Sequence, residues 1–126
     1  MVIPGPDIRA IKLAAYRGLV CLAVRREQSI CVYGTESGEP WDWSYEIREK
    51  AGAGLWLMVC GKGVFLMTQA GIYGKRDSGG FVRETVLPEE LSWPENMPPF
   101  VGIFRDAVWS IGSINEKRRI WSYTVS

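Results

Sequence analysis

Residues 34–47 read GTESGEPWDWSYEI, and this stretch decides the expected fold. From residue 41 to residue 47 apolar and polar side chains alternate strictly, which is the period-2 pattern of a half-buried β-strand. One face carries Trp41, Trp43, Tyr45 and Ile47, and the other carries Asp42, Ser44 and Glu46. The preceding residues include two glycines and a proline, which are typical of a tight turn. The stretch therefore predicts a turn followed by a strand.

Short apolar runs continue this pattern on both sides. LVCLAVR (19–25) and SICVYG (29–34) are rich in β-branched and aromatic residues and are separated by REQ, which predicts a hairpin. Residues 7–16 fit neither the strand nor the helix period cleanly, so both alternatives stay open there. Residues 88–99, PEELSWPENMPP, contain four prolines and are expected to be irregular.

The predicted strands group into three units of about 40 residues, at approximately 8–50, 54–90 and 99–126. Trp41, Val82 and Trp121 take corresponding places in our alignment, and a fixed period near 40 indicates a repeat architecture such as propeller blades. We therefore expect one all-β domain, residues 1–126, with three propeller-like repeats. A β-trefoil or another small barrel, also built from three such units, is the alternative fold.

The turn before the aromatic strand resembles the Asp-box of bacterial neuraminidase repeats and related β-propellers, whose pattern is Ser-x-Asp-x-Gly-x-x-Trp. The matching residues of GTESGEPW are Gly34, Glu36, Gly38 and Trp41. This match departs from the pattern at its first two positions. The resemblance implies a structural turn, in which the carboxylate accepts backbone N–H groups, the glycine supplies a positive φ, and the large residue packs beneath the loop.

A second, weaker match lies in KRDSGGFV. Its matching residues are Lys75, Asp77, Gly79 and Val82, so it also departs at two positions. The third unit has only Trp121. Three blades would leave sheet edges bare, whereas propellers usually close with roughly 4 to 8 blades. The resemblance thus implies a homo-oligomer, with a head-to-tail dimer forming a ring of six.

Charge and cysteine content restrict the partners and the compartment. The formal net charge is +1, so no global field would attract nucleic acid or an anionic membrane, and neither is an expected partner. The three cysteines, at positions 21, 31 and 60, lie inside apolar runs and match no zinc spacing. No apolar stretch reaches the roughly 18 residues of a membrane span. We expect a protein of the cytoplasm, or of a host cytoplasm.

Residue types needed for familiar catalysis are missing or scattered. There is no histidine, which excludes Ser-His-Asp and Cys-His nucleophiles, and no phosphate loop, metal site or cofactor is expected. A glycosidase would need two carboxylates across a cleft, and this remote alternative has six candidates. They are Glu36, Asp42, Glu46, Asp77, Glu84 and Asp106.

Aromatic residues beside polar ones are the remaining signal. Stacking faces with hydrogen-bonding neighbours suit sugar rings, so we expect a non-catalytic, lectin-like binding module rather than an enzyme. The candidate stacking residues are Trp43, Tyr45, Trp93 and Tyr123, and the candidate polar contacts are Asp42, Glu46, Arg105 and Arg119. The other interpretation of the tryptophans is a core role, for Trp41, Trp43, Trp56 and Trp121. The alternative function is a protein-interaction or inhibitor module, such as a virus-encoded blocker of a host factor, with residues 88–99 and a sheet edge as the contact surface.

Overall fold

The computed structural model describes residues 7–38, 41–49, 54–76, 79–88, 91, 101–114 and 117–125. In these residues the chain forms eleven β-strands, which belong to three antiparallel sheets. The all-β prediction is confirmed. Residues 10–16 of the ambiguous first segment form a strand.

Each sheet is a meander of consecutive strands, so chain order and spatial order agree. The first sheet contains β1 (Ala10–Tyr16), β2 (Leu19–Arg25), β3 (Ser29–Thr35) and β4 (Trp43–Arg48). The second sheet contains β5 (Trp56–Cys60), β6 (Gly63–Thr68), β7 (Gly71–Arg76) and β8 (Gly79–Thr85). The third sheet contains β9 (Val101–Phe104), β10 (Ala107–Ile114) and β11 (Lys117–Thr124). Within the described residues none of the three sheets closes into a barrel.

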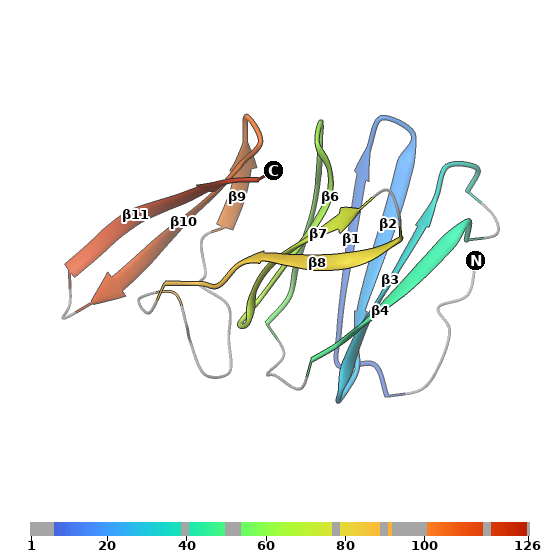
Figure 1. Ribbon diagram of the computed structural model, residues 1–126, viewed down its shortest axis with the longest axis horizontal. Coiled ribbons are helices and arrows are strands. Elements are labelled where there is room, and N and C mark those ends of the chain that lie inside the picture. The colour runs from blue at the N-terminus through green and yellow to red at the C-terminus, as the bar shows by residue number, and fades with distance from the viewer. Residues whose placement is uncertain are drawn as a thin grey trace.

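The sheets lie side by side in chain order, with the second sheet in the middle, and the hairpin between the first two strands of each sheet lies at the upper edge in Figure 1. One apolar cluster joins the first and second sheets and includes Cys21, Ala23, Leu57 and Leu66. The other joins the second and third sheets and includes Phe65, Met67, Val108 and Val125. Since residues on a strand alternate between faces, the second sheet contributes residues of both faces to these clusters, and each outer sheet contributes residues of one face.

Two of these upper-edge hairpins turn through residues of positive φ. Arg17 and Gly18 connect β1 to β2 with φ values of 47° and 83°, and Arg105 and Asp106 connect β9 to β10 with values of 50° and 60°. Two-residue turns with positive φ at both positions match the twist of the strands they join. The sequence signals for these turns are weak, because each turn begins with an arginine, which rarely adopts this conformation.

The expected repeat alignment of three large residues differs from their places in the sheets. Trp41 precedes β4, Val82 lies within β8, and Trp121 lies within β11, which is the third strand of its sheet. The strictly alternating stretch is also shorter than expected, because the strand begins at Trp43 rather than Trp41. The loop before β4 uses Trp41 instead as a partner for the ring of Tyr33, with ring centroids 5.7 Å apart.

All three cysteines carry free thiols, and Cys21 is buried. Burial raises the pKa of the Cys21 thiol to about 11, although the nearby charge of Lys75 opposes this rise. Burial also raises the pKa of the Cys60 thiol. Neither group is therefore a reactive thiolate at neutral pH. No helix in the described part of the chain is long and apolar enough to cross a membrane.

Candidate functional site

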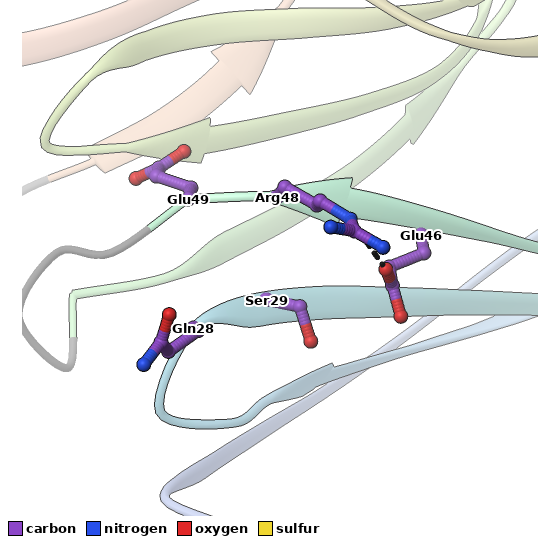
Figure 2. A pocket seen from close by; sticks show the side chains of 5 residues that line it. All are labelled: Gln28, Ser29, Glu46, Arg48 and Glu49. Carbon is purple, nitrogen blue, oxygen red and sulfur yellow. Dashed lines mark ion pairs between the residues drawn. The ribbon is translucent and has the colours of Figure 1, made fainter.

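A polar pocket of about 340 Å³ lies at the end of the first sheet, where the β2–β3 turn meets the end of β4. It is lined by Gln28, Ser29, Glu46, Arg48 and Glu49. Figure 2 shows the side chains of Glu46 and Arg48 turned toward each other, with Ser29 beside them on β3. Glu46 was a predicted contact residue, whereas the other four were not predicted.

The pocket wall formed by Glu46 and Arg48 is an ion pair on the solvent side of β4. Nε of Arg48 lies 3.4 Å from Oε1 of Glu46, and both side chains are largely exposed. An exposed pair of this kind contributes little to stability. Because the side chains of Glu46, Arg48 and Gln28 are all exposed, their polar groups are accessible as donors and acceptors for a polar ligand.

Glu49 borders the pocket at the end of β4, but its carboxylate is turned away from Ser29 and Arg48 toward the second sheet (Figure 2), where it is held far more firmly. Its side chain is 8% exposed and pairs at 3.3 Å with the guanidinium of Arg25, which is 1% exposed. Arg25 also donates to the backbone carbonyl of Glu49 at 2.9 Å, and the hydroxyl of Thr68 donates to Oε2 of Glu49 at 3.0 Å. A carboxylate satisfied in this way keeps one orientation, so it fixes the end of β4 that borders the pocket.

Tyr73 of β7 lies beside this network on the second sheet, close enough for the charge of Glu49 to affect its ionisation. Burial is the main reason that the pKa of Tyr73 rises to about 12, and the negative charge of Glu49 adds to the rise. A tyrosine with a raised pKa is a poor nucleophile at neutral pH. The geometry of Glu49 and Tyr73 is thus that of a structural polar cluster between two sheets.

Two predicted stacking residues, Trp43 and Tyr45, lie between the first and second sheets, not on an open face. Their ring centroids are 5.5 Å apart, and Tyr45 meets Phe81 of β8 edge-on at 6.2 Å. The ammonium group of Lys75 lies 5.0 Å from the ring centroid of Trp43 and 5.4 Å from that of Tyr45. Both aromatic rings are half-buried, so they are packing residues with a partly exposed rim.

The turn that resembles an Asp-box is closed by other groups than expected. The hydroxyl of Thr35 accepts hydrogen bonds from the N–H groups of Ser37 and Gly38, at 3.2 and 3.1 Å. The carboxylate of Asp42 accepts from the N–H of Glu36 at 2.8 Å, whereas Glu36 itself is exposed. The turn carboxylate is therefore that of Asp42 and not that of Glu36, because Asp42 returns to the start of the turn when its N–H bonds to the carbonyl of Gly34. Gly38 has a φ of 92°, the conformation that favours glycine.

The second box-like turn lies only partly within the described residues. Asp77 is outside them, and Gly79 is the first residue of β8. Val82 is half exposed, so it does not pack beneath a loop. Trp93, a predicted contact residue, also lies outside the described residues.

The predicted contacts on the third sheet are separate from those on the first. The guanidinium of Arg105 lies 5.2 Å from the ring centroid of Phe104 at a hairpin tip, and Arg119 is exposed on β11. The hydroxyl of Tyr123 donates to Glu84 at 3.2 Å and links β11 to β8. The structure therefore does not bring the predicted ligand-binding residues together into one site.

A second hollow, of about 240 Å³, lies on the third sheet and is mainly apolar. It is lined by Val101, Gly102, Trp109, Ser110, Ile111 and Ile120. In the described part of the chain no group of His, Cys, Asp and Glu side chains is arranged to hold a metal ion. Comparisons with protein-family models, curated protein sequences and solved structures returned no match.

Of the four pocket residues that were not predicted, Glu49 has a weak and indirect sequence signal, through its partner Arg25. Arg25 stands on the same strand face as Cys21 and Ala23, which marks it as an arginine directed toward the core. Such a residue requires a buried acidic partner. The sequence does not show which acidic residue that is, because Glu49 is 24 positions away.

Proposed function

We propose that this protein is a non-catalytic binding module that takes a small polar ligand, a glycan, in the pocket between the β2–β3 turn and β4. The observation that carries the proposal is a pocket of about 340 Å³ lined by five polar residues, of which Gln28, Ser29, Glu46 and Arg48 can offer side-chain groups to a ligand. Ligand sites commonly occupy roughly 300–1,000 Å³ and orient their ligand by a few placed polar groups. Sugar hydroxyls match the donors and acceptors of Gln28, Ser29, Glu46 and Arg48.

The same geometry supports binding more than catalysis. Both oxygens of Glu49 accept hydrogen bonds from protein groups, and Glu46 pairs with Arg48. A glycosidase needs one carboxyl group to deliver a proton and another to attack or to activate water. Glu49 is thus occupied as a structural group, and the exposed Glu46–Arg48 pair is the part of the pocket that can contact a ligand.

The fold we propose for this module is an open arc of three propeller-like blades. Its support is that each unit is an antiparallel meander and that the three sheets pack face to face in chain order. The free thiols support our expectation of a reducing compartment such as the cytoplasm.

The glycan proposal is tested by glycan-array binding of the unmodified protein, Glu46→Ala and Glu36→Ala. Glu36 is the matched control, because it is an exposed glutamate at the other end of the same sheet. We expect Glu46→Ala to weaken binding about tenfold, the effect of losing one hydrogen bond to a charged group, and Glu36→Ala to bind normally. Absence of any glycan binding, or an equal loss in both variants, contradicts the proposal.

A second candidate function is a protein-interaction module. It is favoured by large apolar side chains that the third sheet leaves exposed, namely Phe104, Trp109 and Ile120. Exposed apolar patches of this kind mark association surfaces in soluble proteins.

A further inference from the structure

The stack of three sheets ends in two faces that expose large apolar side chains. The outer face of the third sheet presents Phe104, Trp109 and Ile120, and the outer face of the first sheet presents Ile11 and Leu13. Both faces lie on the far sides of the sheets from the two apolar clusters. Equivalent positions in the second sheet are covered by a neighbouring sheet, as a comparison of the three sheets shows.

The first hairpin of each sheet gives a common reference for comparing the sheets. In all three sheets one residue pair closes a two-residue turn. Residues that lie the same number of positions from this pair are counterparts in the three sheets. The closing pairs are Tyr16–Leu19, Cys60–Gly63 and Phe104–Ala107.

On the second strand of each sheet, one position is buried in the first and second sheets but exposed in the third. Two residues beyond the closing pair stand Cys21, Phe65 and Trp109. Cys21 and Phe65 are 0% and 2% exposed, because the next sheet covers them, whereas Trp109 is 43% exposed. The third sheet thus carries a large apolar residue at a position that elsewhere faces a following sheet.

On the first strand of each sheet, a position of the opposite face is buried in the second sheet but exposed in the first. Three residues before the closing pair stand Leu13, Leu57 and Val101. Leu57 is 9% exposed and belongs to the cluster that joins the first sheet to the second, whereas Leu13 is 68% exposed. Leu22 and Val24 on the same face of the first sheet are already buried, so the open apolar surface runs along β1.

We propose that a second copy of this chain supplies the missing neighbour: the outer face of the third sheet of one copy packs on the outer face of the first sheet of the other. Within the chain, β5 lies against β1 and β2, and Leu57 joins a cluster bordered by the small residue Ala14. The counterpart of Ala14 in the third sheet is Gly102, which lines the apolar hollow of about 240 Å³. Leu13 of the second copy, the counterpart of Leu57, enters that hollow.

A second copy is the occupant because the chain itself carries both halves of the stacking contact. The open face of the third sheet corresponds to the face by which the second sheet packs on the third. The open face of the first sheet corresponds to the face by which the second sheet packs on the first. A head-to-tail contact between two different faces forms a closed ring when the rotation from one copy to the next leads back to the first copy. Two arcs of three sheets give six, which is within the range of about four to eight sheets found in closed rings.

The proposal goes beyond ligand binding and is tested by light scattering on the full chain over a range of concentrations. The unmodified protein should have twice the chain mass. Leu13→Asp and Ile120→Asp, on opposite ends, should each give a monomer with an unchanged circular dichroism spectrum. Val82→Asp is the matched control and should remain dimeric, because Val82 is a half-exposed apolar residue on the middle sheet.

Mixing the two monomeric variants distinguishes this contact from a symmetric one. A mixed pair keeps one native contact, between the third sheet of Leu13→Asp and the first sheet of Ile120→Asp, so dimer should reappear. A monomeric unmodified protein, or a dimer broken by Ile120→Asp but not by Leu13→Asp, overturns the proposal. A mass that keeps rising above twice the chain mass with concentration would mean open chains of copies, and it would overturn the closed dimer. Phe104→Asp serves as a second third-sheet variant if Ile120→Asp does not fold.

Discussion

The two ends of the seam between the first and second sheets are held together by different forces. At one end Arg25, Glu49 and Thr68 form a buried polar cluster, and at the other end Trp43 and Tyr45 pack near Lys75. The polar contacts are directional and leave little room for adjustment, whereas the aromatic contacts are half exposed and tolerate some movement. The polar end therefore fixes how the two sheets align, and the aromatic end covers the seam. This difference matters for function because Glu49 of the fixed end directly follows β4, which borders the candidate pocket.

The largest effect should come from breaking the polar end. Glu49→Ala leaves the guanidinium of Arg25 buried without its carboxylate, and we expect a loss of about 3–5 kcal/mol in the free energy of unfolding. Urea denaturation of the variant measures this loss. The double variant Arg25→Met with Glu49→Leu should recover much of it, since a buried pair replaced by apolar residues is often tolerated. A single-variant loss below about 1 kcal/mol, the range typical of an exposed pair, would mean that the pair does not hold the sheets together.

A smaller effect should follow from disturbing the aromatic end. A Cβ atom at Gly34 would meet the ring of Trp43, so Gly34→Ala forces that ring to move. We expect a cost of about 1–3 kcal/mol, as for other overpacked sites, together with a change in tryptophan fluorescence. Gly80→Ala is the control, because a Cβ atom there meets open space. Equal behaviour of the two variants would show that Trp43 is not held over Gly34.

The smallest effect is confined to alkaline pH. The folded protein raises the pKa of Tyr73 from 10.0 to about 12, so the folded state holds this proton more tightly than the unfolded chain does. The contribution of Tyr73 to stability is therefore complete below pH 10.0 and is lost as the pH rises to about 12. Tyr73→Phe should remove this part of the alkaline loss, and absorbance of tyrosinate should show one tyrosine ionising late in the unmodified protein. The Cys21 thiol adds a loss in the same direction between pH 9.0 and about 11, which Tyr73→Phe leaves in place. Ionisation of all tyrosines in one step would contradict the assignment.

The candidate site was accessible to sequence analysis only in part. Glu46 was predicted as a polar contact, because alternation in WDWSYEI places it opposite the aromatic face, and it lines the pocket. Trp43 and Tyr45 were predicted as stacking residues, but alternation cannot tell a face that meets solvent from one that meets another sheet. The partners Arg25, Glu49 and Thr68 come from three strand ends that are remote in sequence, so no local pattern connects them.

The sequence by itself determined that the chain is all-β, because period-2 alternation, β-branched residues and closely spaced turns are local properties of the chain. Only the tertiary structure decided which faces the sheets bury, since that depends on stacking between residues tens of positions apart. It also decided that Cys21 and Phe65 are covered while their counterpart Trp109 is exposed. The three residues take the same place relative to the first hairpin of their sheets, and they differ in whether a neighbouring sheet covers that place.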